Sequence, residues 1–293
     1  MKIVIVGAGF GGLRLARKLN NKPGIEVVLI DRFNHHQFQP LFYQVATAAL
    51  NGSDISFPLR KVFHNSKNVS VRLAELSQIN AADNTVVTSE GNFAYDQLVI
   101  ATGADTNFFG NSNFEKFAWP MKSTVEAMEI RNHILKNFEA ALMEADVLHR
   151  QRLLNIVVVG AGPTGVELSG AIAEMKKYVL PKDYPELDFE AMNIYLLEGG
   201  LKTLAAMSEK SSLQSKNYLE RLGVKVKTNA MMQDYNGKTV FLADGSSIES
   251  SMVIWAAGIK GNIPTGIDAS LIVRGNRIKV NLQCKVKKKK NIY

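Results

Sequence analysis

The sequence predicts an α/β fold built from two Rossmann-like, three-layer domains with short antiparallel meanders. A Gly-x-Gly-x-x-Gly pattern occurs twice, at residues 7–12 and at residues 160–165. Each copy follows an apolar, β-branched run and precedes a helix-like segment, an order that is typical of dinucleotide-binding domains. One copy alone would be weak evidence, but two copies predict two dinucleotide sites on one chain.

The first half begins with a βαβ unit. Residues 2–6 predict a buried strand, residues 13–19 a short helix, and residues 27–30 a second parallel strand that ends at Asp31. Residues 33–66 have no clear period, but their aromatic side chains argue against disorder. We therefore expect a functional loop in this segment.

Short antiparallel strands are expected next. They lie at residues 69–73, 85–89 and 93–95, with a hairpin turn at residues 90–92. A buried strand at residues 97–100 then ends in the small-residue turn Ala101-Thr102-Gly103.

The second half repeats this order. A capping box at residues 123–126 opens a long amphipathic helix. The other expected elements are a strand at 156–159, a helix at 166–179, a surface insertion at 181–192, a strand at 193–197 ending at Glu198, a helix at 212–222, strands at 224–226 and 239–242, and a buried strand at 252–255 ending in Ala256-Ala257-Gly258. A repeat period of roughly 150 residues indicates duplicated domains.

The glycines of the first pattern have separate roles. Gly7 allows a tight turn, Gly9 lets the backbone approach a pyrophosphate, and Gly12 allows close packing of helix on strand. The pyrophosphate would bind at the positive end of the following helix. Asp31, 19 residues after Gly12, is placed to accept a hydrogen bond from a ribose hydroxyl.

The second pattern contains Gly160, Gly162 and Gly165. Its acidic partner is Glu198, 33 residues after Gly165 because of the proline-containing insertion. A carboxylate at this place accepts from a free 2′-hydroxyl and repels a 2′-phosphate, so we expect NADH rather than NADPH. Glu167, in the first turn of the helix, either only complements the helix dipole or acts near the nicotinamide.

Composition excludes several classes of protein. The formal charge of +8 owes much to five C-terminal lysines (Lys285, Lys287, Lys288, Lys289 and Lys290), so the body is mildly basic and no nucleic-acid partner is expected. The single cysteine, Cys284, excludes an internal disulfide and a redox-active cysteine pair. No apolar run is long enough to span a bilayer, and the N-terminus does not resemble a signal peptide.

Other catalytic patterns are missing from the sequence. Without paired Cys/His spacing no metal site is expected, and without G-x-S-x-G or Walker patterns neither acyl nor phosphoryl transfer is favoured. His35 and His36 lie in the irregular loop, where an inert role is favoured over catalysis.

Four segments resemble type II NADH dehydrogenases, which are non-proton-pumping NADH:quinone oxidoreductases. This family belongs to the FAD/NAD(P)-binding flavoproteins with two dinucleotide-binding domains. The segments are Phe38-Gln39-Pro40-Leu41-Phe42-Tyr43-Gln44-Val45-Ala46, Ala101-Thr102-Gly103 after Tyr95-Asp96, Gly160-Ala161-Gly162-Pro163-Thr164-Gly165-Val166-Glu167, and Val253-Ile254-Trp255-Ala256-Ala257-Gly258. The resemblance covers essentially the whole chain.

This resemblance implies FAD at the first glycine turn and NADH at the second. The residues implied in FAD binding are Gly7, Gly9, Gly12, Asp31, Gln44, Val45, Ala46, Thr102 and Gly103. Those implied in NADH binding are Gly160, Gly162, Gly165, Glu198 and Gly258, and Glu167 is the implied catalytic residue. The FAD domain would take residues 1–115 and 257–293, and the NADH domain residues 116–256. The implied reaction is hydride transfer from NADH to flavin, followed by two-electron reduction of a membrane quinone.

The chain departs from the family at its C-terminal end. Family members continue with a strand ending in Gly-Asp that holds part of FAD, and then with a region that supplies part of the quinone pocket and the membrane anchor. This chain ends at Tyr293, so we expect a C-terminally truncated protein with an incomplete FAD domain. The expected partners are NADH, a quinone and a membrane surface contacted through the missing region, and a homodimer is left open. The expected location is cytoplasmic, peripheral on the inner face of the cell membrane.

Three alternatives compete with this interpretation. A disulfide reductase of the same fold needs a cysteine pair, which this chain lacks. A ferredoxin or rubredoxin reductase stays open, because a protein acceptor leaves little trace in the sequence. A nucleotide-binding redox sensor or a catalytically impaired fragment would bind a dinucleotide without turning it over.

Overall fold

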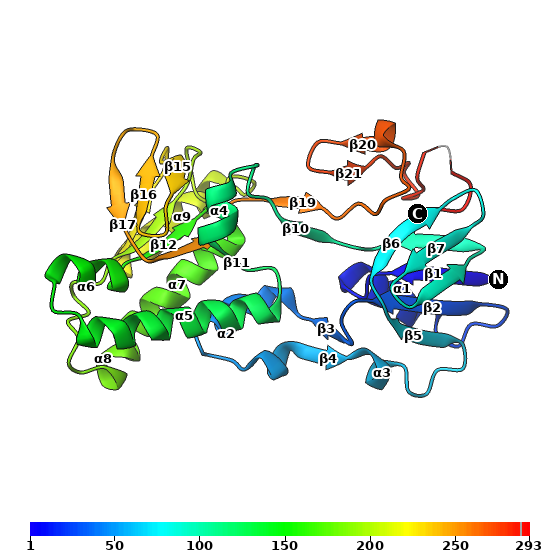
Figure 1. The fold of residues 1–293 in the computed structure, drawn as a ribbon, viewed down its shortest axis with the longest axis horizontal. Coiled ribbons are helices and arrows are strands. Elements are labelled where there is room, and N and C mark those ends of the chain that lie inside the picture. Colours follow the sequence, from blue (N-terminus) through cyan, green and yellow to red (C-terminus); the bar gives the residue numbers. More distant parts are fainter. Residues whose placement is uncertain (288) are drawn as a thin grey trace. The chain divides into compact units, whose positions relative to one another are not determined.

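The chain forms two units in the computed structural model, which describes residues 1–287 and 289–293. Unit 1 comprises residues 1–37, 56–105 and 259–293, and unit 2 comprises residues 38–55 and 106–258 (Figure 1). Lys288, one of the five C-terminal lysines, lies outside the described residues.

A parallel sheet with the strand order β5-β2-β1-β9 forms the centre of unit 1. Its strands are β1 (Lys2–Val6), β2 (Glu26–Asp31), β5 (Val69–Leu73) and β9 (Gln97–Ile100). The helices α1 (Phe10–Leu19) and α3 (Leu59–Val62) and the antiparallel strands β6 (Leu76–Asn80), β7 (Thr85–Thr88) and β8 (Gly91–Ala94) accompany the sheet.

Successive side chains of β1 pack on opposite faces of this sheet, as the period of two in a strand requires. Ile3 and Ile5 belong to the core that includes residues of α1 and α3. Val4 and Val6 belong to the core shared with the antiparallel meander β6-β7-β8. Unit 1 therefore has three layers, with helices on one face and a meander on the other.

Unit 2 repeats this plan around a five-stranded sheet in which every neighbouring pair is parallel. The strand order is β11-β18-β12-β13-β14, with β11 (Trp119–Pro120), β12 (Ile156–Val159), β13 (Ile194–Leu197), β14 (Val224–Lys227) and β18 (Met252–Trp255). The helices are α2 (Phe42–Ala46), α4 (Ser112–Phe117), α5 (Thr124–Met143), α6 (Val147–Leu154), α7 (Pro163–Tyr178), α8 (Leu180–Asp183) and α9 (Glu209–Arg221), and the meander is β15 (Met232–Tyr235), β16 (Thr239–Leu242) and β17 (Ser247–Glu249).

The two faces of this sheet also carry separate cores. Ile156 and Val158 of β12 pack in the core that includes α5 and α7. Val157 and Val159 pack in the core shared with α4 and the meander β15-β16-β17. The expected α/β fold with two Rossmann-like, three-layer domains is thus confirmed.

Short elements complete the chain. Two strand pairs are antiparallel: β3 (His35–Gln37) with β4 (Ser56–Pro58), and β20 (Ile272–Val273) with β21 (Arg277–Ile278). A further pair joins β10 (Ala104–Thr106) to β19 (Ile259–Gly261), and the 3-10 turns are η1 (Gln39–Leu41), η2 (Gly52–Ile55) and η3 (Ala269–Leu271).

Some local predictions were wrong. Residues 69–73 form β5, which pairs with β2 in parallel rather than in an antiparallel meander. The missing meander strand is β6, where the register shifts between Leu76 and Gln78 and interrupts the alternation that marks a strand. Residues 181–192 are not a surface insertion, because Leu187, Phe189 and Met192 are buried in the helical core of unit 2.

The loop at residues 33–66 is divided between the units. Residues 38–55, expected in the first domain, belong to unit 2 because Val45, Ala46 and Ile55 pack into its helical core. The capping box is confirmed in part: the Ser123 hydroxyl accepts from the Glu126 N–H at 3.1 Å, but the Glu126 carboxylate accepts from Lys122 instead of Ser123.

Two glycines of α7 allow a test of the tight helix–strand packing. A Cβ at Gly165 would lie 1.9 Å from the carbonyl oxygen of Gly160. A Cβ at Gly170 would meet only the Leu219 Cδ2 methyl, at 3.6 Å, which is ordinary van der Waals contact. We expect Gly165→Ala to lower the free energy of unfolding by about 3 kcal/mol. Gly170→Ala should be neutral or stabilising by about 0.5 kcal/mol, because alanine favours helix. Urea titrations of both variants check this, and equal effects would contradict it.

Candidate functional site

The first glycine turn joins β1 to α1 in unit 1. Gly7 has φ +103°, and a Cβ there would lie 2.1 Å from the Ala101 carbonyl oxygen at the end of β9. A Cβ at Gly12 would lie 1.8 Å from the carbonyl oxygen of Gly7. Any side chain at these two positions would therefore push the helix away from the strand ends.

Gly9, between these two glycines, faces open space. A Cβ at Gly9 would meet no atom within 4 Å, and no side chain caps α1, whose N-terminus begins there. The start of a helix attracts anions through its unpaired N–H groups and its dipole. The turn therefore has both the room and the polarity that a diphosphate needs.

Two side chains from later in the sequence fix the backbone of Ala8 in this turn. The Asp31 carboxylate accepts from the Ala8 N–H at 2.6 Å and, through its other oxygen, from the Phe33 N–H at 2.8 Å. The His36 Nδ1 lies 3.0 Å from the Ala8 carbonyl oxygen, which can only accept, so Nδ1 carries the proton. Both polar groups of Ala8 are thus held by side chains.

His36 is an anchoring residue that sequence reasoning treated as inert. Its side chain is buried, with 7% exposed, and its ring meets the Phe10 ring edge-on at 5.1 Å between centroids. No spacing rule signalled this role, because the bond forms between the loop and a turn 28 residues earlier.

A cavity of about 370 Å³ adjoins this turn within unit 1. It brings together Gly7, Asp31 and Thr102 of the expected site, and its wall also includes residues 260–264. The Thr102 hydroxyl donates to the Asn262 carbonyl at 2.6 Å and so fixes that wall. Gly103 lines a neighbouring cavity of about 270 Å³, together with Thr102. The lining role of residues 260–264 was missed by the sequence analysis.

The second glycine turn, in unit 2, has the same construction. Gly160 has φ +100°, and a Cβ there would lie 2.5 Å from the Ala257 Cα. Gly162 is the N-cap of α7, where a Cβ would again meet nothing within 4 Å, and Pro163 occupies the first turn. Proline suits this position because its missing N–H would have no helical partner there.

Glu198 repeats the contacts of Asp31. One carboxylate oxygen accepts from the Ala161 N–H at 2.8 Å, and the other accepts from the Gly200 N–H at 2.8 Å. A carboxylate can accept about four hydrogen bonds, so these two backbone contacts leave capacity for a ribose hydroxyl. The sequence indicated the acid but not its attachment to the turn.

The strand order places the acid on one side of each glycine turn and the small-residue turn on the other. In unit 2, β12 lies between β13, which ends before Glu198, and β18, which ends before the turn at Ala256-Ala257-Gly258. In unit 1, β1 likewise lies between β2, which ends at Asp31, and β9, which ends before Thr102. Ligands of such folds bind beyond the carboxyl ends of the strands, where these residues lie.

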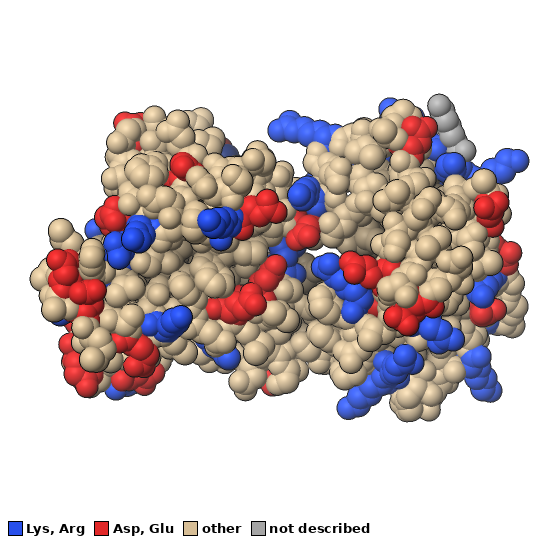
Figure 2. All heavy atoms as spheres, viewed as in Figure 1, with Lys and Arg blue, Asp and Glu red and all other residues tan. Residues whose placement is uncertain are grey.

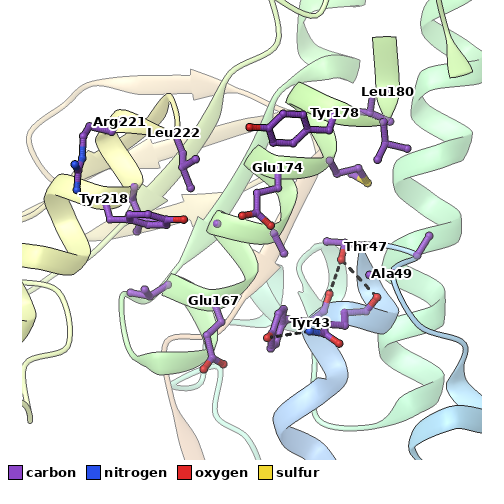
Figure 3. A pocket seen from close by; sticks show the side chains of 18 of the residues that line it. Tyr43, Thr47, Ala49, Glu167, Glu174, Tyr178, Leu180, Tyr218, Arg221 and Leu222 are labelled. Atoms are coloured by element: carbon purple, nitrogen blue, oxygen red, sulfur yellow. Dashed lines mark hydrogen bonds between the residues drawn. The ribbon is translucent and has the colours of Figure 1, made fainter. Parts of the chain in front are cut away.

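Glu167 and Gln44 line a different cavity of unit 2, with a volume of about 980 Å³. Its walls come from α2, α7, α8 and α9, and in Figure 3 Glu167 and Glu174 project from α7 while Tyr43 projects from α2. Partial burial raises the pKa of Glu167 above the usual carboxyl range. Within the described part of the chain, its carboxylate has no hydrogen bond or ion pair.

Two expected flavin-lining side chains point elsewhere. Val45 and Ala46 are fully buried in the helical core of unit 2, with 0% and 1% exposed. Neither residue offers an accessible surface to a ligand, so the assignment of these residues to a flavin site stays a prediction.

The described residues form neither a metal-ligand cluster nor a membrane-spanning helix. Among residues 1–287 and 289–293, no three His, Cys, Asp or Glu side chains gather in a way that could hold a metal ion. None of the helices that these residues form has both the length and the apolar character needed to cross a membrane. Lys and Arg side chains are interspersed with acidic ones on the face drawn in Figure 2.

Two glycine turns, each with an open helix start and a carboxylate on the next strand, define a protein with two dinucleotide-binding domains. Residues 1–293 match the family described as pyridine nucleotide-disulphide oxidoreductase, and the chain belongs to this family. Its single cysteine means that it has no internal cysteine pair.

The resemblance to type II NADH dehydrogenases is confirmed by individual relatives. The chain is 39% identical over 269 residues to the type II NADH:quinone oxidoreductase Ndh of Mycobacterium tuberculosis, and 37% identical over 305 residues to NdhA of that organism. The matches cover 89% and 100% of this chain but only 58% and 65% of those relatives. A structure of NDH2 from Plasmodium falciparum in complex with NADH has a TM-score of 0.89 at 24% identity, covering all of this chain and 63% of that one, so it supports the fold.

The anchoring role of His36 predicts a loss of stability when its donor is removed. We expect His36→Leu to lower the free energy of unfolding by about 1–3 kcal/mol, because the buried Ala8 carbonyl loses its partner. His36→Asn, which keeps a donor, should recover part of this loss. His35→Leu is the control and should change stability by less than about 0.5 kcal/mol, because His35 is only half-buried and its ring bonds to the neighbouring exposed side chain of Asn34. Urea titration measures all three, and equal losses at His35 and His36 would argue against the anchor.

Proposed function

We propose that this protein oxidises NADH with bound FAD and passes two electrons to a quinone without pumping protons. The balanced reaction consumes NADH, a proton and a quinone and yields NAD⁺ and a quinol. The observation that carries the proposal is the pair of equivalent glycine turns, at residues 7–12 and 160–165. They occur on a chain that is similar to type II NADH:quinone oxidoreductases.

The first turn has features that suit FAD. The start of α1 at Gly9 would receive the diphosphate, and Asp31 would accept from a ribose hydroxyl. Thr102 and Gly103 would lie along the rest of the molecule, beside the cavities of unit 1. When bound, FAD supplies the hydride-accepting and two-electron chemistry, and the protein supplies position and surroundings.

The second turn has features that suit NADH. Gly162 leaves the start of α7 open for the diphosphate, with Gly160 and Gly165 keeping helix and strand close. Glu198 would accept from the 2′-hydroxyl of the adenosine ribose, while its negative charge would repel a 2′-phosphate.

We assign to Glu167 the role of proton donor to the quinone. Quinol formation consumes two protons, and a carboxyl whose pKa is raised stays protonated to higher pH than an ordinary one. The apolar walls of the cavity that Glu167 lines suit the apolar body of a quinone. Protonated Glu167 would donate to a quinone oxygen.

Two further assignments follow from the resemblance alone. They are peripheral attachment to a membrane surface and a location on the inner face of the cell membrane, and a homodimer stays open. The organisation into an FAD domain and an NADH domain is likewise a proposal, for which the equivalent turns of units 1 and 2 are the support.

The function is tested by following the two half-reactions separately. The purified chain, supplied with FAD, should lose its flavin absorbance at about 450 nm on anaerobic addition of NADH. A short-chain quinone should then restore it. Glu167→Gln should keep the first step and slow the second, and the wild-type second step should slow as pH rises through the pKa of Glu167. A chain that binds no FAD would refute the proposal. Restoration of the flavin absorbance by oxidised ferredoxin or rubredoxin but not by quinone would favour the alternative reductase.

The cofactor preference gives a separate prediction. We expect wild-type kcat/KM to be higher for NADH than for NADPH, and Glu198→Gln to narrow the ratio by about tenfold because the charge that repels the 2′-phosphate is lost. Glu198→Asp keeps the charge and should retain most of the preference. Steady-state assays with both nucleotides measure the ratio, and a wild-type preference for NADPH would contradict the assignment.

A further inference from the structure

Phe109 is an exposed aromatic residue in a strained backbone conformation. Its φ is +53°, and 65% of the residue is accessible to solvent. A bulky side chain rarely adopts this left-handed conformation, and such outliers cluster at ligand sites. Because so much of Phe109 is exposed, its own burial does not account for the conformation.

Hydrogen bonds hold the loop of Phe109 against the end of β18. The Phe109 N–H donates to the Asn107 side-chain oxygen at 2.9 Å. The Asn107 carbonyl accepts from the Trp255 indole N–H at 3.0 Å, and the Asn107 N–H donates to the Gly258 carbonyl at 3.0 Å. The loop therefore follows the strand end, and the backbone of Phe109 is held through its N–H and through Asn107.

The ring of Phe109 lies on the small-residue turn that follows β18. A Cβ at Gly258 would be 2.8 Å from Phe109 Cζ, so a side chain at that position would displace the ring. The ring is also 6.3 Å from the Trp255 ring, at an interplanar angle of 62°. Phe114 packs more closely on Trp255, at 4.7 Å, and fills the core beneath. Phe109 is thus an additional ring on the outside of this aromatic cluster.

The strand order indicates which part of a dinucleotide would reach Phe109. The start of α7, which follows β12, is the place for the diphosphate, and Glu198 marks the adenosine side above β13. β18 lies on the other side of β12. A dinucleotide that crosses the glycine turn therefore extends its nicotinamide half toward Gly258 and Phe109.

We propose that the exposed ring of Phe109 packs against the nicotinamide of NADH and positions it at the end of β18. The assignment rests on the proposed binding of NADH at the second glycine turn. Aromatic side chains stack on flat heterocycles with enough energy to change affinity several-fold. Gly258 contributes because it has no side chain, which leaves room for the Phe109 ring.

The test compares a ligand that has the nicotinamide ring with one that lacks it. Isothermal titration calorimetry of the full chain would use the redox-inert tetrahydro analogue of NADH and, in parallel, ADP-ribose. Phe109→Gly should weaken binding of the NADH analogue about tenfold and leave the affinity for ADP-ribose unchanged. Glu198→Gln should weaken both ligands, because both contain the adenosine ribose.

Two controls separate positioning from folding. Glycine accepts a positive φ, so the thermal midpoint of Phe109→Gly should equal or exceed that of the wild type. Phe109→Tyr keeps a flat ring and should bind the NADH analogue with near wild-type affinity.

The outcomes distinguish the inference from the proposed function. Equal weakening of both ligands by Phe109→Gly, or no weakening of either, overturns the role of Phe109 while leaving NADH binding intact. Failure of the wild-type chain to bind either ligand overturns the proposed function, and the role of Phe109 with it.

Discussion

The backbone of one alanine in each glycine turn depends on a carboxylate at the end of the neighbouring strand. Asp31 accepts from Ala8, and Glu198 accepts from Ala161, in each case with the other oxygen on a second N–H two residues beyond the acid. The bond joins the turn to the adjacent strand, so the helix start, the glycines and the acid form one rigid group. Losing the charge would therefore affect the shape of the turn as well as its ligand.

This constraint explains why each acid serves two purposes. A charge-assisted hydrogen bond to a backbone N–H is stronger than a neutral one, and it remains when no ligand is present. Preformed geometry lowers the entropy lost on binding. In unit 1 the His36 bond to the Ala8 carbonyl adds a second restraint, and the equivalent carbonyl of Ala161 accepts from the Leu204 N–H at 2.8 Å.

Much of this architecture could be predicted because the glycine pattern, the acid at the end of the next strand and the apolar strand runs are all recognisable in the local sequence. The positions of Gly7, Gly160, Asp31 and Glu198 and the duplicated order of elements needed no knowledge of distant contacts. The errors have a common physical origin: the partner of β5, the burial of residues 187–192 and the membership of residues 38–55 are set by tertiary packing. Phe109 was also missed, since a positive φ at phenylalanine has no signature in composition or spacing.

The distribution of two rare residue types has a practical consequence. Cys284 is exposed and lies in unit 1, whereas both tryptophans, Trp119 and Trp255, lie in unit 2. A fluorophore attached to that one thiol would accept excitation energy only from indoles of the other unit. The sequence thus already carries one labelling site in unit 1 and two indole donors in unit 2.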